Sequence, residues 1–106
     1  MAANYHRGTR LERLARKTLE QNGYAVIRSA GSKGAVDLAA FSAKRVLLVQ
    51  VKAGRVTPAD VRKLKAFPAP PGAVKQFWQR DGKGWKVSEV EEGWFHINVE
   101  PTGGEQ

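Results

Sequence analysis

Apolar and polar residues follow one another along this chain in patterns that predict two helices and several strands. Over residues 8–22 apolar side chains recur every three or four positions, as in an amphipathic helix, and Gly23 is suited to end it. Residues 57–67 form a second helical pattern, with Thr57 as the N-cap and Pro58 at the first helical position. Runs of β-forming residues predict strands over 24–30, 36–41, 46–52, 73–80 and 84–90, and a short strand over 94–99.

The predicted elements come in the order helix, three strands, helix, two strands (α-β-β-β-α-β-β). This order indicates an α/β fold in which a single central mixed β-sheet is flanked by helices. Neither an internal repeat nor a linker interrupts the pattern, so we expect one domain over residues 1–100. Residues 101–106 are predicted to form a flexible C-terminal tail.

Polar residues interrupt two of the predicted strands at positions where a buried sheet would carry apolar ones. If the hairpin loop between these strands has two or four residues, the numbers of facing residues sum to 87, and Asp37 faces Gln50. A loop of three or five residues would instead place Asp37 opposite a valine. Alternation along the second strand places Lys52 beside Gln50, so the three polar side chains converge on one face. The other face of that strand is apolar, with Leu47, Val49 and Val51.

These polar residues suit the binding of a divalent metal ion. The Asp37 carboxylate, a backbone carbonyl and the Gln50 amide oxygen would form an oxygen-ligand site for Mg²⁺ or Mn²⁺. The Lys52 ammonium could position a water or stabilise charge on a phosphate. Glu12, at the margin of the first helix's apolar stripe, would add a carboxylate if that helix packs on the same face. The simpler alternatives are an exposed Asp37–Lys52 ion pair and a Glu12–Arg16 pair at i+4.

The charge distribution favours a polyanionic partner. The formal net charge is +8, and residues 1–86 hold all 18 basic residues with only five acids, a balance of +13. Nucleic acid is the first candidate, because Lys and Arg contacts to phosphates give affinity that does not depend on base sequence. A basic surface that only aids solubility is the alternative. Candidate phosphate contacts are Arg7, Arg10, Lys33 and Arg55, with a phosphate cradle at Gly31, Ser32, Lys33 and Gly34.

The composition excludes several other classes of protein and site. Because the chain contains no cysteine, it has neither a disulfide framework nor a thiolate metal site. No stretch is apolar for long enough to span a membrane, and the first twenty residues lack the apolar core of a signal peptide. We therefore expect a cytoplasmic location and no membrane partner.

The first half of the chain resembles the archaeal-type Holliday junction resolvases, a family within the PD-(D/E)XK nuclease superfamily. That family carries a glycine and, four residues later, a glutamate on its first helix, and here these are Gly8 and Glu12 in RGTRLER. A glycine, an aromatic residue and a strand ending in RSAGS follow in the family. The same order is present here in GYAVIRSAGS, residues 23–32.

The polar residues of the predicted hairpin extend this resemblance. The family continues with an aspartate and, thirteen residues on, a Glu-x-Lys motif, and here these positions are Asp37 and Gln50-Val51-Lys52. The similarity covers residues 5–55 well and the remainder weakly. Gln50 departs from the family pattern, because an amide oxygen still ligates a metal but contributes no charge to hold it.

The resemblance implies a restriction-endonuclease-like fold and a homodimeric, Mg²⁺-dependent endonuclease, with Mn²⁺ as a possible substitute. Its implied substrate is branched DNA, above all the four-way (Holliday) junction, which it would resolve by paired phosphodiester cuts. Asp37 and Gln50 would hold the metal, Lys52 would hold the attacking water, and Glu12 would help to bind the metal or orient its water.

The resemblance also assigns roles to the RSAGS segment. Arg28 and Ser32 would contact the phosphate backbone near the scissile bond, which includes Ser32 among the candidate catalytic residues. The departure at Gln50 leaves other functions open. They are an Mrr-like or repair-type duplex nuclease, a catalytically inactive DNA-binding module on the same fold, and a basic structural subunit of a larger assembly.

Overall fold

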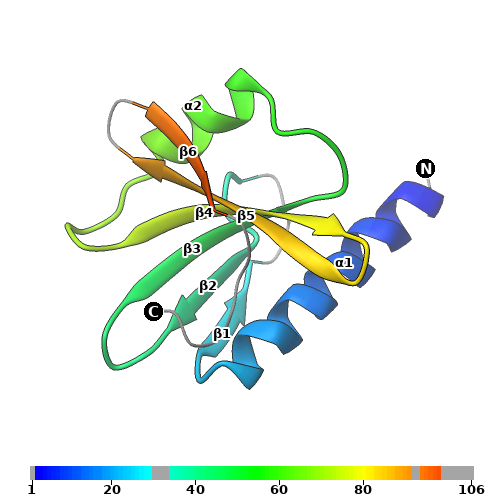
Figure 1. The fold of residues 1–106 in the computed structure, drawn as a ribbon, viewed down its shortest axis with the longest axis horizontal. Helices are drawn as coiled ribbons and strands as arrows, with labels where there is room; N and C mark the ends of the chain where they lie inside the picture. Colours follow the sequence, from blue (N-terminus) through cyan, green and yellow to red (C-terminus); the bar gives the residue numbers. More distant parts are fainter. Residues whose placement is uncertain (1, 30–33, 92–93, 99–106) are drawn as a thin grey trace.

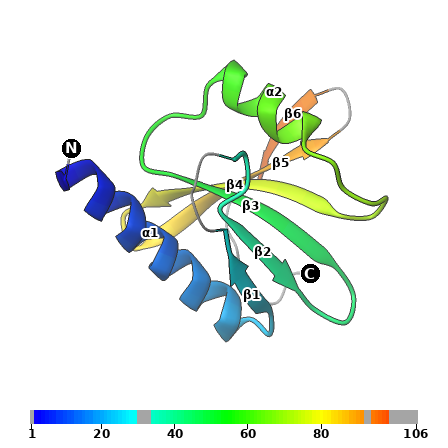
Figure 2. The same cartoon turned by 180° about the vertical axis from the view of Figure 1, so that it is seen from behind.

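The protein folds around one six-stranded mixed sheet with strand order β1-β2-β3-β4-β5-β6 (Figures 1 and 2). The computed structural model describes residues 2–29, 34–91 and 94–98, and side chains within 9–29 and 34–90. The helices are α1 (Ala2–Gln21) and α2 (Pro58–Ala66). The strands are β1 (Ala25–Arg28), β2 (Leu38–Phe41), β3 (Val46–Lys52), β4 (Val74–Asp81), β5 (Gly84–Glu91) and β6 (Trp94–Asn98). The predicted α/β fold and element order are confirmed, with the short last strand present as β6.

Differences from the predicted boundaries lie at element ends. Helix α1 begins at Ala2 rather than at Gly8, so Gly8 lies inside the helix although glycine has a low helix propensity. It ends as predicted, because Gly23 has a φ of 93° and donates its N–H to the Glu20 carbonyl. The tail predicted at 101–106 lies outside the described residues.

Helix α1 covers one face of the sheet and forms the larger core with it. Leu11, Leu14, Ala15 and Leu19, from the apolar side of the helix, all take part in this core. The buried sheet residues of this core are Leu38, Ala40, Leu47, Val49, Trp78, Trp85 and Val87. Val51 packs against the same core, so the apolar side of β3 is the one predicted.

Helix α2 covers the opposite face and forms a second, smaller core. Its buried residues are Val36, Leu48, Leu64, Phe77 and Val90. The predicted N-cap is confirmed, because the Thr57 side chain accepts the Asp60 N–H while the Asp60 carboxylate accepts the Thr57 N–H. Since Leu48 faces α2 and alternate residues share a side, Gln50 and Lys52 also project to the α2 face.

The β2–β3 hairpin has the predicted register, with Phe41 paired to Val46 and Leu38 to Val49, so paired numbers sum to 87. Strict pairing ends there, because the Asp37 N–H donates to the Val49 carbonyl at 2.8 Å. Among the described residues, the pairing of β3 with β2 ends at Val49, and the other side of β3 remains paired in parallel with β4. The polar residues gather at this half-buried end of β3.

Neither helix, over the residues that the structure describes, combines the length and apolarity needed to cross a bilayer. The cytoplasmic location stays a prediction.

Candidate active site

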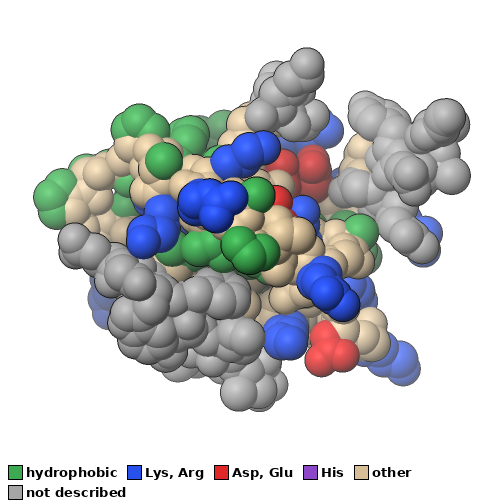
Figure 3. Space-filling view, turned by 90° about the horizontal axis from the view of Figure 1, so that it is seen from above, with side chains coloured by type: hydrophobic (Ala, Val, Ile, Leu, Met, Phe, Trp, Pro, Cys, Tyr) green, Lys and Arg blue, Asp and Glu red, His purple; other side chains and the backbone are tan. Residues whose placement is uncertain are grey.

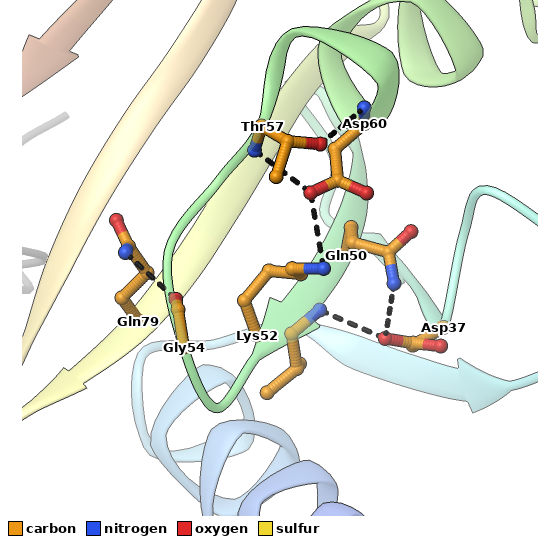
Figure 4. A network of polar contacts seen from close by, with 8 residues as sticks. Asp37, Gln50, Lys52, Gly54, Thr57, Asp60 and Gln79 are labelled. Carbon is orange, nitrogen blue, oxygen red and sulfur yellow. Dashed lines mark hydrogen bonds and ion pairs between the residues drawn. The ribbon is translucent and has the colours of Figure 1, made fainter.

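Asp37 lies immediately before β2, where the hairpin pairing ends. Its Oδ2 accepts the backbone N–H of Val51 at 2.8 Å and the Nε2 of Gln50 at 3.1 Å (Figure 4). In a longer β2 a backbone carbonyl would accept the Val51 N–H, so the Asp37 carboxylate takes that place in the plane of the sheet. With Asp37 only 6 % exposed, the strand end holds a buried carboxylate.

The surroundings of Asp37 disfavour its ionised form. Burial raises the pKa of this carboxyl from its ordinary value of 3.8 to about 6. The hydrogen bond from Val51 lowers the pKa, the charge of Glu12 raises it, and Lys52 and Arg28 lower it. The net effect is a raised pKa, so the hydrogen bond and the nearby positive charges offset only part of the cost of burying the ionised carboxylate. A cation bound at this carboxylate would supply the remaining compensation.

Lys52 contacts a different acid from the one considered in the sequence. Its Nζ lies 3.0 Å from Oδ2 of Asp60 on α2 (Figure 4), and no ion pair between Lys52 and Asp37 occurs within the described part of the chain. The alternative of an exposed Asp37–Lys52 ion pair is therefore wrong. Lys52 still lies close enough to Asp37 to lower the pKa of its carboxyl.

Glu12 approaches the same carboxylate from the other face of the sheet. The condition under which Glu12 would join Gln50 and Lys52 on one face is not met, because α1 packs against the opposite core. The negative charge of Glu12 nevertheless acts on Asp37, which lies just before β2, and raises the pKa of its carboxyl. The predicted Glu12–Arg16 pair is also absent from the described residues, since Arg16 pairs with Glu20 at 3.0 Å.

A salt bridge holds Glu12 in this position. The Oε1 of Glu12 lies 3.0 Å from Nε of Arg28 on β1, and the Glu12 side chain is 16 % exposed. This contact crosses from the helix to the edge strand, next to the strand end that carries Asp37. The salt bridge places a carboxylate and a guanidinium on the α1 side of the site.

The donors at the strand end fit a hard divalent cation. They are the Asp37 carboxylate, the Gln50 amide oxygen and the Val51 backbone carbonyl, all of them oxygens. The raised pKa of Asp37 points the same way, because a buried and under-compensated carboxylate gains most from a cation. Among the described side chains no three His, Cys, Asp or Glu residues form a cluster, so the site depends on one carboxylate, an amide and a backbone group, with Glu12 nearby.

A family description matches almost the whole of this chain. The family is "Archaeal holliday junction resolvase (hjc)", and the match covers residues 3–98. The chain belongs to this family. The resemblance seen in the sequence is thereby confirmed.

One curated protein and one solved structure are similar to this chain. It is 42% identical over 72 residues to the crossover junction endodeoxyribonuclease Hjc of Methanocaldococcus jannaschii, covering 63% of this chain and 53% of that protein. The chain thus spans about half the length of this curated relative. Its fold is similar to that of Hjc from Archaeoglobus fulgidus, a Holliday junction resolvase, with a TM-score of 0.67, 24% identity, and coverage of 89% of this chain and 84% of the other.

The DNA-binding residues predicted from the charge distribution and from the resolvase resemblance are only partly described. Arg10 is exposed on α1, and Arg55 is exposed in the loop that follows β3. Arg28 is half-exposed and engages Glu12. Arg7 belongs to α1, but its side chain is outside the described part, and Ser32 and Lys33 are outside the described residues. Their roles stay predictions.

Two polar residues at the site were missed from the sequence. The sequence places Asp60 only in the first turn of the second predicted helix, and its contact with Lys52 depends on how the intervening loop folds. Gln79 donates its Nε2 to the Gly54 carbonyl at 3.0 Å and lies beside Lys52 in the parallel pairing of β3 and β4. The sequence carries no signal that singles out Gln79, because Lys75, Gln76, Arg80 and Asp81 are polar residues of the same strand.

Proposed function

We propose that this chain is a metal-dependent endonuclease that hydrolyses phosphodiester bonds in branched DNA, four-way junctions above all. The observation that carries the proposal is the buried Asp37 carboxylate near Lys52. This carboxylate accepts hydrogen bonds from the Gln50 side chain and the Val51 backbone at a strand end. Membership of the archaeal Holliday junction resolvase family supports junction DNA as the substrate. The same support favours one nuclease-like domain over residues 1–100, built on the single sheet.

The metal ligands would be Asp37 and Gln50, with the Val51 carbonyl and help from Glu12. When bound at these residues, a divalent ion would supply Lewis-acid chemistry to the phosphate and its attacking water. We infer Mg²⁺ as the natural ion, with Mn²⁺ as a substitute, because the donors are all oxygens. To bind it, the Gln50 amide would turn its oxygen toward the site, in place of the N–H that now donates to Asp37.

The remaining residues of the site would handle the water and the phosphate. The Lys52 ammonium carries a compact positive charge that can orient the attacking water or stabilise charge on the phosphate. Glu12, held by Arg28, would orient water on the α1 side. Ser32 is retained as a catalytic candidate that contacts the phosphate near the scissile bond.

A basic surface would bind the DNA backbone. Figure 3 shows Lys and Arg side chains spread over the face seen from above, interspersed with a few acidic ones. We assign phosphate contacts near the site to Arg7, Arg10, Arg28, Ser32, Lys33 and Arg55. This contact set would make binding strongly dependent on salt.

Paired cuts in a junction imply two copies of the chain. One strand end forms one site, and two symmetric cuts in opposite strands need two such sites related by a two-fold axis. We therefore propose a homodimer as the active form.

Gln50 favours a second candidate, a module that binds junction DNA without cutting it, because an amide adds no charge to hold the metal. A cleavage assay separates these functions. It compares a synthetic four-way junction with a linear duplex of the same sequence, in Mg²⁺ and in Mn²⁺. The proposal predicts symmetric cuts in the junction and little cutting of the duplex. Equal cutting of both would indicate a duplex nuclease, and binding without cutting in either ion, even in Gln50→Glu, would indicate the inactive module.

A further inference from the structure

The Lys52–Asp60 contact joins the candidate site to the start of α2. Lys52 Nζ lies 3.0 Å from Asp60 Oδ2, with the two side chains only 25% and 23% exposed. The same oxygen accepts the backbone N–H of Thr57 at 2.9 Å. The Asp60 N–H in turn donates to the Thr57 hydroxyl at 3.1 Å. The helix cap therefore fixes the Asp60 carboxylate independently of its contact with Lys52.

Asp60 is suited to remain charged in this position. Partial burial acts to raise the pKa of its carboxyl, but hydrogen bonds from Thr57 and Lys52 outweigh burial and lower the pKa. Asp60 thus presents a fixed negative charge to the ammonium. A lysine side chain without such a partner would sample many rotamers, because its stem is long and flexible.

The loop between Lys52 and Thr57 is fastened as well. Gln79 on β4 donates to the Gly54 carbonyl at 3.0 Å, and Gln79 is the β4 neighbour of Lys52. Figure 4 shows this contact and the Asp60 contact at the two ends of the same loop. The position of Asp60 relative to Lys52 is therefore set by the backbone.

We propose that Asp60 is a positioning residue for Lys52: its carboxylate, fixed by the helix cap, holds the ammonium at the Asp37–Gln50 site. Asp60 does not touch the substrate in this account and acts only through Lys52. The inference rests on the proposed nuclease function, since Lys52 needs an assigned role for its position to matter.

Two variants separate the charge of Asp60 from its part in the helix cap. In Asp60→Asn the amide oxygen can still accept the Thr57 N–H, but the charge that attracts Lys52 is gone. In Thr57→Ala the hydroxyl half of the cap is lost and the carboxylate stays, so this variant is the matched control. Asp60→Glu restores the charge on a longer side chain and tests rescue.

The direct readout is the NMR signal of the Lys52 ammonium in the metal-free protein, assigned by its loss in Lys52→Arg. A lysine held by a fixed carboxylate has protected ammonium protons and a restricted side chain. We expect this signal in the wild type and in Thr57→Ala, and its loss in Asp60→Asn. Retention of the signal in Asp60→Asn would overturn the proposal.

The functional readout is the single-turnover rate of junction cleavage, measured together with junction affinity. We expect Asp60→Asn to slow cleavage about ten-fold or more at nearly unchanged affinity, because a misplaced catalytic group slows the chemical step. Thr57→Ala should stay within about two-fold, and Asp60→Glu should recover part of the rate. An equal loss in Thr57→Ala and Asp60→Asn, or an unchanged rate in Asp60→Asn, would overturn the proposal.

A failure of the proposed nuclease function has its own signature. In that case the wild type cuts no DNA with any divalent ion. The positioning role in catalysis is then overturned as well, and the ammonium signal still decides whether Asp60 holds Lys52.

Discussion

The Asp37 carboxylate accepts the backbone N–H of Val51 at 2.8 Å, in the plane of the sheet and just beyond the last paired residue of β2. This position explains how one carboxylate lies near Gln50 and Lys52 from the α2 face and near Glu12 from the α1 face. It also explains its burial, since the strand end encloses it on both sides. The site is thus built where one strand stops and its neighbour continues.

The raised pKa of Asp37 makes the stability of the metal-free protein depend on pH. The folded pKa is about 6 against 3.8 in the unfolded chain, so the folded state holds this proton more tightly. The contribution of this group to stability is therefore fully present below pH 3.8 and is lost as pH rises through 6. The whole difference amounts to about 3 kcal/mol as an upper limit.

Asp37→Asn isolates this contribution. The asparagine oxygen can still accept the Gln50 and Val51 N–H groups, and the uncharged amide avoids the desolvation that Asp37 suffers. We expect the variant to be more stable than the wild type at pH 7.5, by up to about 3 kcal/mol, and the difference to shrink toward pH 4. Urea unfolding at several pH values measures it. A variant that is less stable than the wild type at pH 7.5 would contradict the assigned cause of the shift.

Gln50→Glu should lower the stability of the metal-free protein and raise its affinity for Mg²⁺. The substitution removes the N–H that donates to Asp37 and places a second carboxylate beside it, so two acids disfavour each other's ionisation. We expect the metal-free variant to lose about 1–3 kcal/mol at pH 7.5. Thermal unfolding with increasing Mg²⁺ should show a larger stabilisation than in the wild type and at lower concentration. An unchanged response to Mg²⁺ would argue against Gln50 as a ligand.

Arg55 and Lys44 test the location of the DNA surface. Arg55 is exposed in the loop after β3, next to the candidate site, whereas Lys44 is exposed in the β2–β3 turn at the other end of the hairpin. We expect Arg55→Ala to weaken junction binding and to reduce the slope of log affinity against log salt by about one. Lys44→Ala should leave both nearly unchanged. A larger effect from Lys44 would move the DNA surface away from the strand end.

The hairpin could be predicted from the sequence because its polar residues constrained the register. Only an even loop length brings Asp37 opposite an amide rather than a valine, and the pairing of Leu38 with Val49 has that register. The start of α2 could also be predicted from the sequence, since Thr57 and Pro58 are local signals that need no tertiary contact.

The side of the sheet on which α1 packs could not be predicted in the same way. Alternation along a strand tells which residues share a face, but it does not tell which helix covers that face. The partner of Lys52 was missed for a related reason. Asp60 satisfies a helix cap locally, and its contact with Lys52 arises only when the loop folds back along β4.

The most direct test of the account is cleavage of a four-way junction in Mg²⁺ by the wild type, Asp37→Asn and Lys52→Ala, each first shown to bind the junction. The account predicts metal-dependent cutting by the wild type and a loss of at least about a hundred-fold in both variants at similar junction affinity. Cutting by Asp37→Asn at the rate of the wild type would contradict the assignment of this strand end as the active site.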